Sequence, residues 1–364
     1  MIPRSNILVQ ILLIPFSWLY GLIMHMRNWL YDTGIYQSES FDIPVINIGN
    51  ITVGGTGKTP HVEYVARILQ EKYTVALLSR GYKRKTSGFV LANENATAET
   101  IGDEPFQMKQ NLGEKIIVAV DADRKRGIWK LLKSQPEIDV ILLDDAFQHR
   151  RVTPGLNILL VDYNRPICKD RHLPAGNLRE ASSEKKRADI IIVSKCPSNI
   201  LPIEVRTFTT ELKALPYQNT FFSTYRYGDL RHITKSERPL NLNELQHYNV
   251  LLVTGIAEPQ VLKSHLETLT KNLRAIRYAD HHNFSQNDIK HIEKTFLEMP
   301  QSKSIIITTE KDAVRLKNHL ANFCEICHSK IYVLPIEVDI LQDKEDQFSK
   351  KIMDFIIKSQ RIIG

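Results

Sequence analysis

The chain has 364 residues, of which 43% are hydrophobic and 24% are charged, as is typical of a folded protein with room for two domains. Its four cysteines are too few for a disulfide framework. The formal net charge of +7 at pH 7 favours an anionic partner. Nucleic acid, anionic lipid and a phosphorylated substrate all meet that condition, so charge alone does not choose among them.

The N-terminal part of the chain carries an uncharged, largely apolar run from Ile7 to Met24. A helix over these 18 residues reaches about 27 Å, close to the thickness of the hydrocarbon core of a bilayer. Trp18 and Tyr20 favour the membrane interface, and no small-residue cleavage site follows, so we expect no cleavable signal. A buried core helix is the alternative. We interpret residues 1–35 as a membrane-associating segment that either lies in the membrane or spans it.

Short apolar runs alternate with segments of helical periodicity between residues 36 and 210. Continuous apolar strands separated by helices indicate a parallel sheet covered by helices. We therefore predict an α/β fold, a parallel sheet flanked by helices, for this part of the chain. The predicted strands are 43–48, 74–78, 115–120, 139–143 and 188–194, and a helix is predicted over 61–70.

The pattern of apolar and polar residues changes after this region. Polar residues dominate from about Leu201 to Asn243, and no strong apolar strand stands out there. We predict a linker over 211–243 and a second, smaller α/β domain over 244–364. Its predicted strands are 250–254 and 304–308, and its predicted helices are 258–269 and 285–299.

The first predicted strand ends in a glycine-rich loop, NIGNITVGGTGKTP, residues 47–60. Phosphate-binding loops read G-x-x-x-x-G-K-[ST]: backbone N–H groups cradle phosphates, Lys reaches the β- and γ-phosphates, and the hydroxyl binds Mg²⁺. Here a threonine replaces the first glycine, but the loop lies between a strand and a helix, as the motif requires. The predicted nucleotide-binding residues are Thr52, Val53, Gly54, Gly55, Thr56, Gly57, Lys58 and Thr59.

A second signal lies at Asp144 and Asp145, which end the apolar strand predicted over 139–143. Carboxylates at the end of a neighbouring strand hold Mg²⁺ in many P-loop proteins. Two ordinary turns are the alternative, but the pair and the glycine loop occur in the right order. The sequence therefore predicts a parallel sheet of the P-loop NTPase type, flanked by helices, with a site for ATP and Mg²⁺. The predicted metal ligands are Thr59, Asp144 and Asp145.

The run Cys324-Glu325-Ile326-Cys327-His328 spells the attachment signature of c-type haem. Haem attachment needs export of the protein, which the sequence does not indicate. A zinc site would need a second pair of ligands, which the sequence pattern does not show. We interpret the motif as coincidental.

The motifs resemble those of the tetraacyldisaccharide 4'-kinase family, the lipid A 4'-kinases of Gram-negative bacteria. The loop with its threonine has this family's spelling, and the order and spacing of the matches are highly specific. One departure is Ala146, where the family usually has glycine. The further matching runs are LSRGY (78–82), GDEP (102–105), DDAFQH (144–149), LPAGNLRE (173–180), TGIAEP (254–259), ADHHNF (279–284) and TEKDAVRL (309–316).

The resemblance implies transfer of the γ-phosphate of ATP to the 4'-hydroxyl of a tetraacyldisaccharide 1-phosphate, which forms lipid IVA. Within that frame Lys58 neutralises phosphate charge, because phosphoryl transfer relies on positioning and charge stabilisation. Asp103 is the implied base for the sugar hydroxyl, with His281 as its partner across the cleft between the domains. Asp145 completes the implied catalytic set, and Asp144 or Asp145 is the rival base.

The resemblance also implies substrate contacts, namely Tyr82, Glu104, Arg124, Gln148, His149 and Arg179. On the bare sequence Asp103 is an ordinary turn residue, and His281 and His282 are a surface pair. We interpret the basic run Lys185–Arg187 as a solvated face. The implied location is the cytoplasmic side of the inner membrane, with the lipid as partner and no nucleic acid or protein partner.

Two other classes use similar loops. A membrane-associated switch ATPase typically has a lysine just before the glycine pair, where this chain has Val53. A GTP-binding protein has an N-K-x-D motif after a late strand, and the runs at 194–197 and 310–312 do not match it. The kinase is therefore the favoured interpretation, and the switch ATPase is the alternative.

Overall fold

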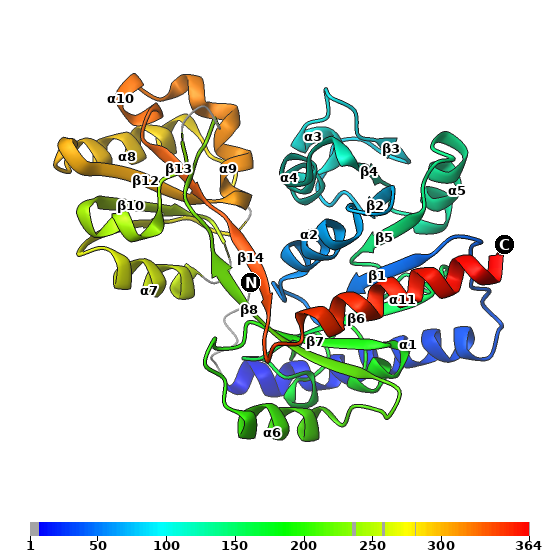
Figure 1. Ribbon diagram of the computed structural model, residues 1–364. Helices are drawn as coiled ribbons and strands as arrows, with labels where there is room; N and C mark the ends of the chain where they lie inside the picture. Colours follow the sequence, from blue (N-terminus) through cyan, green and yellow to red (C-terminus); the bar gives the residue numbers. More distant parts are fainter. Residues whose placement is uncertain (1–6, 235–237, 257–258, 281, 364) are drawn as a thin grey trace. The chain divides into compact units, whose positions relative to one another are not determined.

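A computed structural model describes residues 7–234, 238–256, 259–280 and 282–363 (Figure 1). The chain forms two compact units. Unit 1 comprises Met1–Ala96, Met108–Tyr225 and Val338–Gly364, and unit 2 comprises Thr97–Gln107 and Arg226–Glu337.

These units differ from the predicted domains in two segments. Residues 97–107, expected in the kinase core, group with unit 2, and residues 338–364 return to unit 1. The return has a hydrophobic cause, because Phe348, Ile352 and Ile356 of the last helix are buried in the core of unit 1. The region predicted as a linker is also structured, since a nine-residue strand crosses its middle.

Unit 1 is built on a nine-stranded sheet with the order β14-β8-β7-β6-β1-β5-β2-β4-β3. β1 lies in the middle, parallel to β5 and β6, and Ile48 pairs in register with Asp144. The carboxyl ends of β1 and β5 therefore meet at one edge. The strands are β1 (Val45–Gly49), β2 (Val75–Ser79), β3 (Val90–Leu91), β4 (Ile116–Val120), β5 (Val140–Asp144), β6 (Leu156–Asp162), β7 (Ile190–Ser194), β8 (Asn219–Tyr227) and β14 (Ile336–Ile340).

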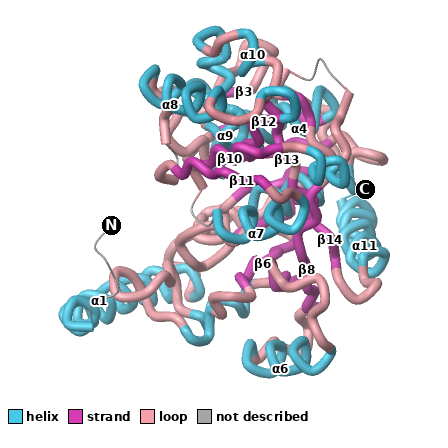
Figure 2. Tube along the Cα trace, turned by 90° about the vertical axis from the view of Figure 1, so that its left-hand side faces the viewer, coloured by secondary structure: helices cyan, strands magenta, loops and turns pink. Residues whose placement is uncertain are grey.

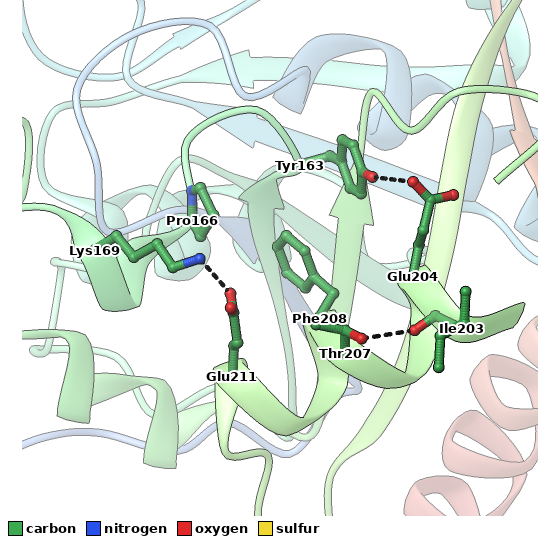
Figure 3. A pocket seen from close by; sticks show the side chains of 8 residues that line it. All are labelled: Tyr163, Pro166, Lys169, Ile203, Glu204, Thr207, Phe208 and Glu211. Atoms are coloured by element: carbon green, nitrogen blue, oxygen red, sulfur yellow. Dashed lines mark hydrogen bonds and ion pairs between the residues drawn. The ribbon is translucent and has the colours of Figure 1, made fainter. Parts of the chain in front are cut away.

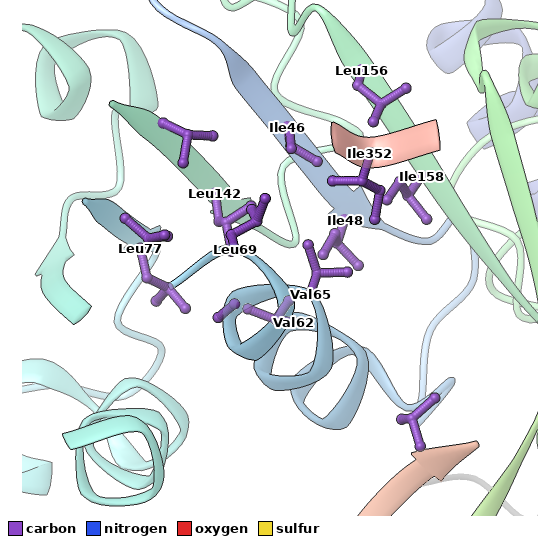
Figure 4. Packing of buried hydrophobic residues seen from close by; sticks show 14 of the residues in the cluster. Ile46, Ile48, Val62, Val65, Leu69, Leu77, Leu142, Leu156, Ile158 and Ile352 are labelled. Carbon is purple, nitrogen blue, oxygen red and sulfur yellow. The ribbon is translucent and has the colours of Figure 1, made fainter. Parts of the chain in front are cut away.

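Helices cover both faces of this sheet, because alternate residues of a strand point to opposite faces. Ile46 and Ile48 pack with α2 (Lys58–Leu69) and α11 (Glu345–Ile363), as Figure 4 shows, and the C-terminal part of α4 (Asp103–Leu112) joins them. On the other face the strands pack with α5 (Arg124–Ser134) and α6 (Pro202–Leu212). The predicted parallel, helix-covered α/β sheet is confirmed.

The N-terminal helix α1 (Ile7–Asp32) lies along unit 1 outside the sheet (Figures 1 and 2). The alternative of a buried core helix is wrong, because Trp18 is 75% exposed and Leu12 is 71% exposed. Among the described residues, no helix is long and apolar enough to cross a membrane. The spanning form of the predicted anchor is therefore not found in this part of the chain.

Unit 2 has a five-stranded sheet with the order β11-β10-β12-β13-β9, parallel except for β9. Its two faces are covered by α8 with α9 and by α7. The predicted second α/β unit is therefore present. Its strands are β9 (Arg231–His232), β10 (Asn249–Thr254), β11 (Asn272–Arg277), β12 (Ser304–Thr309) and β13 (Ile331–Leu334). Its helices are α3 (Ala98–Ile101), α7 (Pro259–Leu269), α8 (Gln286–Leu297), α9 (Glu310–Leu316) and α10 (Glu325–His328).

Candidate functional site

The glycine loop joins the end of β1 to the start of α2, as predicted. Gly54 and Gly57 have φ values of 98° and 85°, in the left-handed region that L side chains rarely adopt. A Cβ atom on Gly57 would also lie 1.8 Å from the hydroxyl of Tyr225. The backbone thus turns before α2, and the N-terminus of that helix faces the loop, an arrangement that favours bound anions.

The position of Thr52 explains why the loop can depart from the usual spelling. Thr52 has no positive φ value, so a side chain costs nothing there. It is buried, and its backbone forms a bridge with Leu178. The Asn50 side-chain amide donates to the Thr56 hydroxyl at 2.8 Å and reaches the Thr52 hydroxyl at 3.4 Å. The threonine therefore serves as an internal support of the loop.

Two further elements hold the loop from outside. The Ser194 hydroxyl, at the end of β7, donates to the Thr56 carbonyl at 2.8 Å. The Val53 N–H donates to the Asn177 carbonyl at 2.8 Å. These two hydrogen bonds hold the shape of the loop, which is the preorganisation that phosphate binding needs.

His61 is a structural support of the glycine loop that the sequence analysis did not predict. It is fully buried in the first turns of α2, where Nδ1 lies 2.7 Å from the Gly57 carbonyl and Nε2 lies 2.9 Å from the Ser223 hydroxyl. Burial lowers the pKa of His61 to about 4, so the ring is neutral at pH 7. Because a carbonyl only accepts, Nδ1 carries the proton and Nε2 accepts from Ser223. His61 thus ties the last loop glycine to β8.

Asp145 lies directly beside the loop. Its carboxylate is 3.6 Å from Nζ of Lys58 and 3.2 Å from Nη1 of Arg179. Burial alone would raise the pKa of Asp145, but the charges of Lys58 and Arg179 outweigh it and lower that pKa. Lys58, Asp145 and Arg179, which were predicted from separate motifs, therefore lie together. The lowered pKa means that Asp145 is ionised. Its φ of 50° is one that aspartate tolerates better than most residues.

Asp144 occupies the other side of the end of β5. It is buried, and its Oδ2 accepts from the Ser79 hydroxyl at 2.8 Å. The next residue but one, Ala146, is buried without a positive φ value, so alanine fits where the family usually has glycine. The Asn47 side chain accepts from the Ala146 N–H at 3.2 Å and thereby ties this turn to β1.

Several residues predicted to contact the substrate make hydrogen bonds within the protein. Arg124 is 2% exposed and donates to the backbone carbonyls of Asp121 and Asp144, and its contact with the substrate stays a prediction. His149 accepts from the Arg124 backbone N–H, and burial together with the Arg124 charge lowers its pKa. Gln148 donates to the Asn50 carbonyl at 2.7 Å.

The remaining predicted residues of the lipid side fall in two places. Tyr82 is 61% exposed, and the Lys83 ammonium lies 5.7 Å from its ring. Glu104 follows Asp103 in the first turn of α4. Arg187 differs from its prediction, because it is not solvated: it pairs with Glu180 and Glu184.

Unit 2 gathers four motifs around one arginine. Arg315 of α9 is 5% exposed and donates to the Asp312 carboxylate at 3.0 Å and to the His282 carbonyl at 3.0 Å. Its Nε lies 3.9 Å from Oδ2 of Asp103. Asp312 also accepts from the Gly255 N–H at 2.9 Å. The GDEP, ADHHNF, TGIAEP and TEKDAVRL runs thus converge within one unit.

The predicted pairing of Asp103 with His281 stays a prediction, because His281 lies outside the described residues. The assignment of Asp103 to the other domain is corrected, since residues 97–107 belong to unit 2. The neighbouring His282 pairs with Asp288 at 3.0 Å and stacks on Tyr278 at 4.7 Å between ring centroids.

A pocket of about 350 Å³ lies elsewhere in unit 1 (Figure 3). Tyr163 and Phe208 stack at its wall, and Lys169 pairs with Glu211 across it. None of its lining residues is a predicted site residue, and the pocket carries no functional assignment.

Comparisons with known proteins agree with the geometry. The family model described as tetraacyldisaccharide-1-P 4'-kinase matches residues 9–356. A tetraacyldisaccharide 4'-kinase of Phocaeicola vulgatus is 49% identical over 352 residues, which is 96% of each chain. One of Bacteroides fragilis is 46% identical over 372 residues, covering 98% of this chain and 96% of the relative. A crystal structure of LpxK from Aquifex aeolicus, described as an "apo" form in complex with ATP, has a TM-score of 0.74 and 30% identity over 96% of this chain and 99% of that one.

Proposed function

The chain belongs to the tetraacyldisaccharide-1-phosphate 4'-kinase family, and from this premise we propose how its residues bind ATP, activate the lipid hydroxyl and meet the membrane. The activity itself follows from the family: the enzyme is a kinase of lipid A biosynthesis that transfers the γ-phosphate of ATP to the 4'-hydroxyl of tetraacyldisaccharide 1-phosphate and so forms lipid IVA. The observation that carries the proposed residue roles is the meeting of Lys58, Asp145 and Arg179 beside the glycine loop.

The glycine loop and Lys58 bind the phosphates of ATP. Backbone N–H groups of the loop and the N-terminus of α2 supply partial positive charge. The Lys58 ammonium, held 3.6 Å from Asp145, turns to the β- and γ-phosphates when the nucleotide is bound. Transfer of the phosphoryl group needs little covalent chemistry from the protein, so these positioned charges are its main contribution.

Thr59, Asp144 and Asp145 would hold Mg²⁺. Hydroxyl and carboxylate oxygens are the hard donors that Mg²⁺ prefers, and the ionised state of Asp145 suits this role. The ion would supply charge neutralisation at the transferred phosphate.

Asp103 of unit 2 accepts the proton of the 4'-hydroxyl, with His281 as its partner. Arg315 lies 3.9 Å from Asp103, and its charge is shared with the buried Asp312. A carboxylate oriented in this way has the chemistry of a general base. Asp145 is less suited to that role, because two cations lower its pKa and weaken it as a proton acceptor.

Helix α1 lies in the membrane interface on the cytoplasmic side of the inner membrane, where ATP is available. One side of the helix is apolar and turned away from unit 1. Such a face, rimmed by tryptophan, is typical of helices that insert sideways into the interface. The exposed apolar side chains are Ile11, Leu12, Phe16, Trp18, Leu19, Leu22, Ile23, Met26 and Trp29, each more than half exposed.

The opposite side of α1 is fixed to unit 1 by polar contacts. The Ser17 hydroxyl accepts from the Ala175 N–H at 2.9 Å, and the Tyr20 hydroxyl donates to the Arg179 carbonyl at 3.1 Å. Arg27 and Asn28 both donate to the buried carboxylate of Glu180. The helix therefore rests on the loop that carries Arg179 and aims its apolar side outward.

One assay tests the reaction together with its residue roles. The purified protein in detergent receives ATP, Mg²⁺ and tetraacyldisaccharide 1-phosphate, and mass spectrometry reads the lipid product. We expect one added phosphate on the distal sugar with the wild type and a strong loss with Asp103→Asn. ATP hydrolysis without lipid phosphorylation contradicts the proposal and favours a switch ATPase.

A flotation experiment tests the membrane face. Leu12, Leu19 and Leu22 are replaced together by serine, and binding to vesicles with anionic lipid is compared with the wild type. Val261→Ser is the matched control, because Val261 is 64% exposed on a helix of unit 2. We expect the triple variant to lose vesicle binding and the control to keep it. Equal binding of both variants excludes α1 as the membrane contact.

A further inference from the structure

The Cys324–His328 motif, which the sequence analysis interpreted as coincidental, lies beside a third possible metal ligand. Cys324 precedes α10, and Cys327 is the third residue of that helix. Glu293 comes from α8, which packs beside this segment. The two sulfur atoms and one carboxylate oxygen of Glu293 all lie within 4.8 Å of one another. The sequence had no visible third ligand, because Glu293 is 31 positions before Cys324.

We propose that Cys324, Cys327 and Glu293 bind a thiophilic divalent cation of the zinc class, which joins α8 to the segment before β13. Thiolate sulfur and carboxylate oxygen are both ligands that zinc takes in proteins. A tetrahedral zinc ion with Zn–S bonds of about 2.3 Å sets its sulfurs about 3.8 Å apart. The ligand atoms therefore need to close by about 1 Å or less, and a water molecule fills the fourth position.

Burial and access fit such a site. Cys327 is fully buried in the core of unit 2 among residues of α8 and α9, so it fixes the inner end of the site. Cys324 is exposed, which gives an ion an entry path from solvent. The Cys324 backbone N–H donates to Glu293 Oε1, and this bond holds the carboxylate beside the two sulfurs.

The charge balance of the cluster suits a divalent cation, because Glu293 adds a carboxylate to the two sulfurs. Binding of M²⁺ displaces one proton from each cysteine thiol, so the ion forms two metal–sulfur bonds and two protons go to solvent.

Cobalt titration of the full-length protein under reducing conditions tests the site. Co²⁺ bound by thiolate shows sulfur-to-metal charge-transfer absorption, which a site of oxygen ligands such as Asp144 and Asp145 does not give. We expect this absorption to saturate at one equivalent of Co²⁺ and to disappear when Zn²⁺ displaces the cobalt. Binding of either ion should raise the melting temperature of the protein.

Variants locate the ligands. Cys324→Ser removes an exposed residue and should leave the fold intact while it abolishes or halves the absorption. Glu293→Gln should weaken Co²⁺ binding by more than the roughly 10–100-fold that loss of a supporting neighbour costs. Cys168→Ser and Glu325→Gln are matched controls, because Cys168 is an exposed cysteine of unit 1 and Glu325 is an exposed carboxylate beside the motif. Both controls should bind like the wild type.

Three results of the cobalt titration would overturn the proposal. They are the absence of thiolate absorption in the reduced protein, absorption that Cys324→Ser leaves unchanged, and full affinity in Glu293→Gln. A Cys324–Cys327 disulfide that persists in the reduced preparation, seen as the loss of two hydrogens in the intact mass, would also exclude a metal site.

Discussion

The two functional carboxylates of this kinase lie in different electrostatic settings. Asp145 in unit 1 is flanked by two cations from different motifs, at 3.6 Å and 3.2 Å. Asp103 in unit 2 lies 3.9 Å from Arg315, whose charge is shared with the buried Asp312. Environments that separate two carboxylates in this way also separate their chemical roles. The comparison supports the proposed roles, charge binding for Asp145 and proton acceptance for Asp103.

The largest effect is expected from removal of the base. Asp103→Asn should lower kcat by about 10²–10⁴-fold, because a positioned general base contributes in that range. The KM for ATP should change little, since Asp103 is not part of the glycine loop. Steady-state kinetics of the folded variant measure both constants.

Asp145→Asn is the companion variant, and asparagine also tolerates the left-handed backbone at that position. We expect it to weaken the use of ATP and Mg²⁺ as well as kcat. The assignment of roles is reversed if Asp103→Asn keeps a kcat within a few-fold of the wild type while Asp145→Asn changes kcat alone.

The next effect concerns the cation beside Asp145. Lys58→Ala should reduce lipid phosphorylation by on the order of 10²–10³-fold, as removal of a preorganised charge-stabilising donor does. It should also leave Asp145 paired with Arg179, so the folded variant should stay close to wild type in thermal stability. Near-normal turnover of a folded Lys58→Ala protein would mean that the loop does not bind the transferred phosphate.

The support of the loop by His61 predicts a pH effect on stability. The folded-state pKa of about 4 lies below the ordinary 6.5, so the unfolded chain binds a proton first as the pH falls. Stability is therefore complete above pH 6.5 and declines towards pH 4, by on the order of 3 kcal/mol.

His61→Gln should flatten this decline in urea unfolding measured across the range. His247→Gln is the control, because His247 is exposed. An acid limb that is equally steep in His61→Gln and in the wild type would contradict the buried neutral imidazole.

The smallest effect is expected from the backbone of the loop. Gly57→Ala forces a Cβ atom against the Tyr225 hydroxyl at a φ of 85° and should destabilise the protein by about 1–3 kcal/mol. Addition of Tyr225→Phe removes the oxygen in the clash, so it should recover part of the loss, while the backbone strain stays. Chemical denaturation of the single and double variants measures both values. Full recovery would show that backbone strain at Gly57 contributes nothing.

Local patterns in the sequence were enough to predict the strands that carry the nucleotide site. β5 and β7 are apolar up to their last residue, because both faces of the sheet are buried. β1 follows the same pattern except at Asn47 and Gly49. Such runs can be recognised without tertiary information. β8 was missed because its sequence, NTFFSTYRY, mixes apolar and polar residues. A strand of that composition near a sheet edge resembles a loop.

The parts of the site that could not be predicted depend on packing between distant segments. Nothing in the sequence around His61 indicates that its two nitrogens tie Gly57 to Ser223, 162 positions from His61. The assignment of residues 97–107 to unit 2 likewise rests on tertiary contacts, including that of Asp103 with Arg315. Arg315 itself was part of a recognised motif, but its several partners come from separate runs.

Helix α1 has a pattern of mutational tolerance opposite to that of an ordinary surface helix. On most such helices the hidden side demands apolar residues and the outer side accepts polar ones. Here the hidden side depends on the hydroxyl of Ser17 and the amide of Asn28, which are 4% and 2% exposed. Apolar exchanges among the outer residues should be neutral, whereas Asn28→Leu removes one of the donors to the buried Glu180 carboxylate. Replacement of buried residues by leucine, which suits the hidden side of an ordinary surface helix, should therefore destabilise the attachment of α1.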